Sequence, residues 1–145
     1  MTDDIYQTDL LRLAAEARGA GRLADPDVSV TLDNPLCGDR VTIDLKLSGK
    51  TISAIGHDVR ACVLCQASAS VLGRRAVGHD AAALREIAAI VAHILKPDGE
   101  TRELPWADLA AFEPVAQHRS RHACVLLPFR ALNQALDTAT AKTAP

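Results

Sequence analysis

The chain has 145 residues, of which 48% are hydrophobic and 3% aromatic, and a formal net charge of −2. This length suits one domain whose core is built from leucine, isoleucine, valine and alanine. The charge leaves no basic footprint for nucleic acid or an anionic membrane, and no stretch approaches the roughly 20 apolar residues of a membrane span. The N-terminus lacks a signal-peptide pattern, so we expect a cytoplasmic protein whose cysteines bind metal or react rather than form disulfides.

The first half of the chain is predicted to form one helix and three strands. A helix is expected over residues 3–18. Alternating apolar and polar residues predict strands over 28–32, 41–47 and 52–59, arranged as an antiparallel meander, and Gly56 suggests a bulge in the last strand. Such a sheet needs helices on one of its faces.

The second half is predicted to be helical. The expected segments are 62–76, 80–95, a short helix from Pro105, and 122–138. Residues 138–145 are expected to be a frayed tail. The pattern therefore predicts a single α+β domain over residues 1–145, with a three-stranded antiparallel sheet packed against several helices.

Three cysteines and an aspartate, from three separate places in the chain, are suited to a four-ligand metal site. Cys37 and Asp39 flank Gly38, whose conformational freedom lets both side chains point at one centre. Cys62 and Cys124 fall at predicted helix starts, where free N–H groups favour the thiolate. Thiolates favour zinc or iron–sulfur chemistry, and a carboxylate can complete a tetrahedron. The competing interpretation is that each cysteine is a small buried hydrophobe.

Two nearby residues have open roles. Cys65 forms Cys-x-x-Cys with Cys62, which is typical of a redox pair or of two zinc ligands. The redox interpretation needs a strand-to-helix turn in a βαβ unit, which an antiparallel meander does not supply, so packing is favoured for Cys65. His122 lies two residues before Cys124 and is a further candidate ligand. The other histidines are expected in loops (His57, His118), at the surface (His79) and at the core edge (His93).

Three sequence blocks resemble the signature of the IscU/NifU-like iron–sulfur cluster assembly family. The blocks are Asn34-Pro35-Leu36-Cys37-Gly38-Asp39, Cys62 followed by Ala67-Ser68-Ala69-Ser70, and Cys124 with Leu126. The resemblance covers nearly the whole chain, from about residue 5 to about residue 137. The long interval before Cys124, with Ala123 in place of a histidine and Arg121 three residues before the cysteine, is similar to the SufU branch.

The resemblance implies a SufE/NifU-like fold and a Zn²⁺ ion held by Cys37, Asp39, Cys62 and Cys124. It implies that Cys37 accepts persulfide sulfur from a SufS-type cysteine desulfurase, as in a zinc-dependent sulfurtransferase. Arg121 would contact the partner or the persulfide. Two alternatives stay open: an IscU-like scaffold that assembles a [2Fe–2S] cluster on the same ligands, and a non-catalytic binding module with a structural zinc. The expected partners are iron–sulfur assembly proteins, without nucleic acid or membrane.

Overall fold

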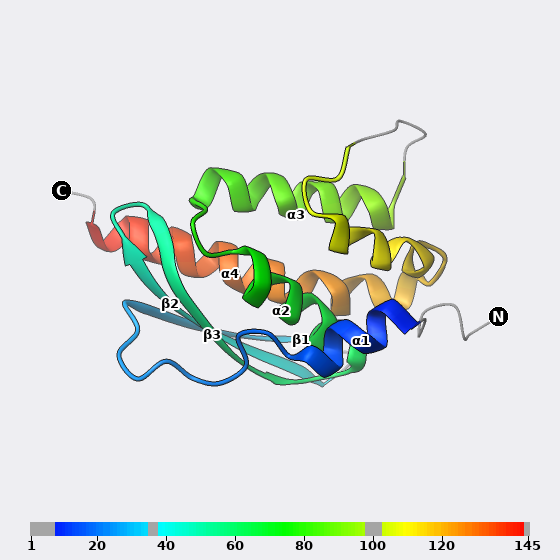
Figure 1. The fold of residues 1–145 in the computed structure, drawn as a ribbon, viewed down its shortest axis with the longest axis horizontal. Helices are drawn as coiled ribbons and strands as arrows, with labels where there is room; N and C mark the ends of the chain where they lie inside the picture. Colours follow the sequence, from blue (N-terminus) through cyan, green and yellow to red (C-terminus); the bar gives the residue numbers. More distant parts are fainter. Residues whose placement is uncertain (1–7, 35–37, 98–102, 144–145) are drawn as a thin grey trace.

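A computed structural model describes residues 8–34, 38–97 and 103–143. Its α+β architecture confirms the predicted fold: a three-stranded antiparallel sheet forms one layer and helices cover one of its faces (Figure 1). Cys37, the predicted sulfur acceptor, lies outside the described residues. None of the described helices is long and apolar enough to cross a membrane.

The sheet has the order β1-β2-β3 and antiparallel pairing throughout. Its strands are β1 (Val28–Asn34), β2 (Asp39–Ser48) and β3 (Thr51–Arg60). Alternate residues of the central strand, Val41, Ile43 and Leu45, are fully buried under the helices. The alternation in the sequence therefore predicted all three strands, and each extends slightly beyond its predicted range.

Gly56 does not mark a bulge, contrary to the prediction. It pairs in register with Asp44, and the register shift of the β2–β3 pair lies between Lys46 and Leu47. Gly56 is instead required by a close approach, because a Cβ atom there would lie 2.5 Å from the carbonyl oxygen of Gly21. The segment that follows the first helix thus packs directly on β3.

His57 is the second correction in this region, because it lies in β3 and is only 4% exposed rather than in a loop. Its backbone N–H donates to the carbonyl of Gly19, and its carbonyl accepts from the N–H of Gly21. Its ring nitrogen Nε2 is 2.7 Å from the carbonyl oxygen of Arg18. These contacts attach residues 18–21 to the edge strand.

The helices form two layers on the sheet (Figure 1). They are α1 (Thr8–Glu16), α2 (Val63–Arg75), α3 (Ala81–Leu95) and α4 (His122–Thr143), with two 3-10 helices, η2 (Ala107–Gln117) and η3 (Arg119–Arg121). Helices α2 and α4 contact the sheet, α1 packs on α2, and α3 packs on α4. The short helix expected from Pro105 is η2.

Helix α4 is longer than predicted and continues to Thr143 instead of fraying from residue 138. Leu136 and Ala139 are both buried, so the last turns still contribute to the core. The helix begins at His122, as predicted, and runs through Pro128.

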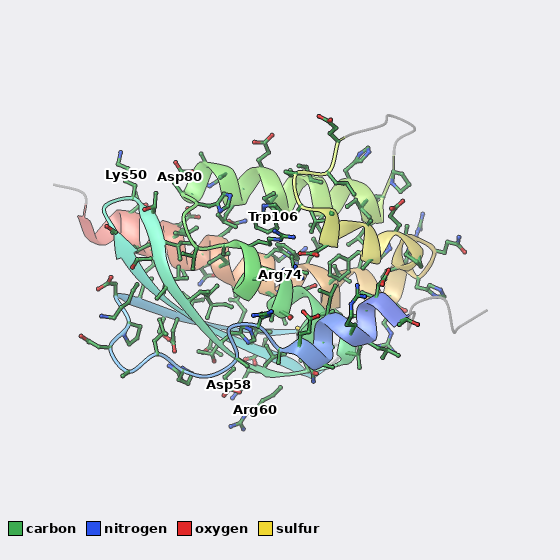
Figure 2. The ribbon with its side chains drawn as sticks, viewed as in Figure 1. Lys50, Asp58, Arg60, Arg74, Asp80 and Trp106 are labelled. Carbon is green, nitrogen blue, oxygen red and sulfur yellow. The ribbon has the colours of Figure 1, made fainter. Side chains whose placement is uncertain are left out.

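His79 was expected at the surface but is half-buried. Its ring packs edge-on against Trp106, with the ring centroids 5.6 Å apart. Trp106 lies in the middle of the helical layer, next to Arg74 in the view of Figure 2. The contact joins the segment before α3 to the segment before η2.

Candidate metal centre

The fold brings three of the four predicted ligands together. Asp39 is the first residue of β2, Cys62 directly precedes α2, and Cys124 lies in the first turn of α4. One ligand atom from each, a carboxylate oxygen and two Sγ atoms, lies within 4.8 Å of the others. Asp39 and Cys124 are buried, whereas Cys62 is partly exposed. The three atoms therefore form a small cluster that opens to solvent on the Cys62 side.

The backbone before β2 determines the position of Asp39. Gly38 has φ +73°, a left-handed conformation that suits glycine, as the Cys-Gly-Asp pattern predicted. Its N–H donates to the carbonyl of Asn34 at 2.8 Å, and Asn34 is also the strand partner of Asp39. The ends of β1 and β2 are thereby held together at the base of the segment that contains Cys37.

Cys62 is the N-cap residue of α2, which confirms the predicted helix start. Its side chain makes no capping hydrogen bond, and its backbone N–H donates to Asp39 Oδ1 at 3.3 Å. The other oxygen, Asp39 Oδ2, is buried and has no hydrogen-bond partner among the described residues. A buried carboxylate oxygen without a donor is costly, and a bound cation would satisfy it.

Cys124 differs from the expectation that a helix start favours its thiolate. Burial raises the pKa of the Cys124 thiol, and the neighbouring Asp39 and Cys62 raise it further. Desolvation and nearby negative charge thus outweigh the partial positive charge of the first turn of α4. Several anionic groups can share this space only when a cation is present.

The donor set fits a zinc or iron ion. Tetrahedral zinc with bonds of about 2.3 Å to sulfur places its ligand atoms roughly 3.8 Å apart. The separations in the cluster, all within 4.8 Å, need only small side-chain movements to reach that geometry. Two sulfurs and one carboxylate oxygen leave one tetrahedral position for a fourth ligand, and Cys37 precedes Asp39 by two residues in the chain.

Cys65 and His122 are not part of this cluster. Cys65 is fully buried in α2, and burial raises the pKa of its thiol, as the favoured packing role predicts. His122 is also buried, and its Nε2 lies 3.2 Å and 3.1 Å from the carbonyl oxygens of Val115 and Ala116. Because two carbonyls can only accept, Nε2 carries the proton and attaches the start of α4 to η2.

The predicted contact residue Arg121 is the last residue of η3 and is half-buried. Its backbone N–H donates to the carbonyl of His118 at 2.9 Å, which closes the short turn before α4. Arg121 is therefore three residues from Cys124, on the segment that leads into the cluster.

Two arginines lie at the rim of the site. Arg40 and Arg60 are direct strand partners at the end of the sheet, and both line a hollow of about 430 Å³ that also includes Asp39. Figure 2 shows Arg60 projecting away from the body of the protein. In the sequence, Arg60 stands two residues before Cys62 and Arg40 stands next to Asp39, and these positions are the signals that point to the rim.

Comparison with known proteins identifies the family. Residues 5–125 match the family model described as the NifU-like N-terminal domain. The chain belongs to this family. The match extends from the N-terminal segment to the first turn of α4, so it includes every residue of the candidate metal centre.

Two relatives of this NifU-like domain have names that describe activities. The chain is 24% identical over 132 residues to the zinc-dependent sulfurtransferase SufU of Bacillus subtilis, covering 91% of this chain and 89% of SufU. It is 26% identical over 134 residues to the iron–sulfur cluster assembly scaffold protein IscU of Thermotoga maritima, covering 91% of this chain and 92% of IscU.

Solved structures are similar over almost the entire chain. The crystal structure of a nitrogen-fixing NifU-like protein from Brucella abortus has a TM-score of 0.89 and 36% identity, with 99% of both chains covered. A putative iron–sulfur cluster assembly scaffold protein for the SUF system from Fervidobacterium islandicum has a TM-score of 0.86 and 22% identity, with 94% of this chain and 99% of that chain covered. At that identity the second similarity concerns the fold alone.

Proposed function

We propose that this NifU-like domain is an iron–sulfur cluster assembly protein that binds zinc and accepts sulfur from a SufS-type cysteine desulfurase. The zinc ligands would be Cys37, Asp39, Cys62 and Cys124. The proposal depends mainly on one observation, the cluster of a carboxylate oxygen and two thiol sulfurs within 4.8 Å of one another. The relative named a zinc-dependent sulfurtransferase supports the choice of zinc and of sulfur transfer.

Bound zinc would supply the positive charge that keeps cysteines deprotonated in a site where burial favours the thiol. The thiolate of Cys37 attacks the outer sulfur of the desulfurase persulfide. A sulfur–sulfur bond to Cys37 forms, the bond within the desulfurase persulfide breaks, and the desulfurase cysteine leaves as a thiolate. Cys37 then carries the persulfide, and no external oxidant or reductant is needed.

Cys37 is the best candidate acceptor because of where the other two proposed cysteine ligands lie. Cys62 is fixed as the N-cap of α2, and Cys124 is fully buried in α4. Cys37 precedes Gly38, whose left-handed backbone lies directly before β2. Arg121, close to Cys124 in the chain, would contact the negatively charged persulfide or the partner, because charge-assisted hydrogen bonds are stronger than neutral ones.

An IscU-like scaffold that assembles a [2Fe–2S] cluster is the second candidate function. The same donor set can bind iron, and a relative at 26% identity is named as an IscU scaffold. A binding module with a structural zinc is less favoured. That function would be best served by a closed site with Cys65 as fourth ligand, and Cys65 is not among the clustered atoms.

The proposal is tested with the desulfurase from the same organism. Alanine and sulfide production are measured with the wild-type chain, Cys37→Ala, Arg121→Ala and the matched control Lys50→Ala, whose exposed side chain lies in the β2–β3 turn at the far end of the sheet. Wild type and Lys50→Ala should stimulate the enzyme equally, Arg121→Ala should stimulate it less, and Cys37→Ala should not stimulate it. Equal stimulation by Cys37→Ala would exclude Cys37 as the acceptor, and no stimulation by wild type would exclude the function.

Metal analysis separates the two candidate functions. Protein purified without oxygen should contain one zinc per chain, with an apparent binding free energy of about 10 kcal/mol or more. Less than about a tenth of an equivalent of zinc, together with a visible iron–sulfur chromophore, would favour the scaffold.

A further inference from the structure

A groove of about 610 Å³ lies between the end of α3 and the first turns of α4. It is separate from the hollow beside Asp39. Its floor is apolar and its rim is basic. The floor includes Leu95, Ala123 and Leu126, and the rim includes Lys96, Arg119 and Arg130.

The three rim cations are exposed, and none of the described residues that line the groove is acidic. Within the described part of the chain, none of the three side chains forms an ion pair or a hydrogen bond. Other arginines do pair with aspartates, namely Arg12, Arg22, Arg40, Arg60, Arg74, Arg75 and Arg85. Because the chain as a whole has a net charge of −2, the groove is a local concentration of positive charge that no described acidic residue offsets.

The walls of the groove are held in place by the fold. Leu95 is buried at the end of α3. His122, which also lines the groove, is attached to η2 through its Nε2. A preformed groove binds a ligand without losing conformational entropy of its own side chains and backbone, which favours affinity. Cys124 follows His122 by two residues, about 200° around the helix, so the groove and the candidate metal centre lie on different sides of α4.

We propose that this groove binds an acidic segment of a partner protein in which carboxylates alternate with leucine-like side chains. The carboxylates pair with Lys96, Arg119 and Arg130, and the apolar side chains cover Leu95 and Leu126. The apolar floor favours a protein segment over a nucleic acid, whose backbone offers charge without apolar anchors. The proposal depends on the proposed function only for the partner's class, a protein of the iron–sulfur assembly machinery.

Binding is tested by fluorescence anisotropy with a short labelled peptide in which leucine alternates with glutamate. A peptide with glutamine in place of glutamate and a single-stranded DNA oligonucleotide are the comparison probes. The acidic peptide should bind, and increasing salt should weaken it, because exposed charges are screened. Equal binding of the glutamine peptide, or tighter binding of the DNA, would overturn the proposal.

Charge reversal locates the binding surface. The double variant Arg119→Glu, Arg130→Glu should bind the acidic peptide at least about tenfold more weakly, and the matched control Lys50→Glu should bind it as wild type does. Circular dichroism checks that each variant is folded. If folded Arg119→Glu, Arg130→Glu binds like wild type, the groove is not the site.

Two further variants separate this proposal from its alternatives. Asp39→Ala alters the metal centre but leaves the groove intact, so retained peptide binding with lost desulfurase stimulation supports the groove independently of the metal. The chain's own Asp98 and Glu100 follow Lys96 in sequence. If the peptide binds only after Asp98→Asn and Glu100→Gln, the chain's own acidic residues occupy the groove and the proposal of a partner is overturned.

Discussion

Replacing Cys65 with serine tests which residues make up the metal centre. Cys65 is fully buried in α2, one turn after Cys62, and it is absent from the cluster of ligand atoms. Serine has nearly the same shape, but its hydroxyl needs a hydrogen-bond partner. A serine hydroxyl in a helix can reach the carbonyls three and four residues earlier. Those of Cys62 and Ala61 already accept from the backbone N–H and the side chain of Gln66, at 3.0 Å each.

The expected loss of stability follows from that competition. A buried hydroxyl without a partner costs about 1–3 kcal/mol, and sharing the Ala61 carbonyl should leave about 1–2 kcal/mol of this cost. For a chain of this length the loss corresponds to a decrease of roughly 3–6 °C in the melting temperature. Cys65→Ala, which introduces no polar group, should lose less than Cys65→Ser. A larger loss for alanine would contradict the hydrogen-bond argument.

Zinc content decides the role of Cys65. Cys65→Ser should retain the zinc of the wild-type protein, measured by elemental analysis of folded, dialysed samples. Cys62→Ser is the control for a lost ligand and should retain less than about half of that zinc, because a thiolate ligand is removed. If Cys65→Ser lost as much zinc as Cys62→Ser, Cys65 would be a ligand and the assigned ligand set would be wrong.

The remaining predictions concern the carboxylate ligand, the buried histidine and a packed glycine. Asp39→Ala should weaken zinc binding by at least about tenfold in competition with a chromophoric chelator, and unchanged affinity would exclude Asp39. Burial lowers the pKa of His57 in the folded protein. The contribution of neutral His57 to stability should therefore be complete above about pH 6.5, and the free energy of unfolding should decrease as the pH falls below that value. Urea titrations at several pH values should show a smaller decrease in the free energy of unfolding for His57→Gln than for wild type. An unchanged pH dependence would show that another group causes the effect. Gly73→Ala should cost about 3 kcal/mol or more, because its Cβ would lie 1.8 Å from the carbonyl oxygen of Arg18, and a loss under about 1 kcal/mol would contradict that contact.

The predictable part of the fold is the part encoded in local patterns. The alternation of Val41, Ile43 and Leu45 with polar residues follows directly from the two-residue period of a strand. The helix starts at Cys62 and Asp80 were likewise predictable, and the Asp80 side chain accepts a hydrogen bond from Ala83 N–H, as an N-cap does. These signals need only neighbours in sequence.

The missed features depend on contacts between distant residues. The burial of His57 was missed because nothing near it in sequence shows that residues 18–21 cover β3. The packing of residues 18–21 on β3 also explains why Gly56 is a site of close approach rather than a bulge. Asp44 is a further example: burial alone would raise its pKa, but hydrogen bonds from Arg22, Ser29 and the Leu23 N–H lower it overall. No local pattern connects residues this far apart in sequence.

The candidate site shows the same division between residue type and environment. Sequence identified Asp39, Cys62 and Cys124 by their chemistry, and only the structure shows that their ligand atoms lie within 4.8 Å of one another. Sequence also placed Cys124 at a helix start, but the rise in its pKa depends on burial and on Asp39, which is distant in the chain. The arginine pair at the rim appears only when β2 and β3 are aligned.

The location of the centre explains how one ligand could exchange without unfolding the protein. Asp39 belongs to the sheet, Cys62 begins α2, and Cys124 lies in α4, which packs on β1 and β2. An ion bound by these three residues would link the sheet to both helices, and the hydrogen bond from Cys62 N–H to Asp39 already joins two of them. Under the proposed function, Cys37 could then leave the metal to carry sulfur, because the remaining ligands are held by packing that does not depend on it.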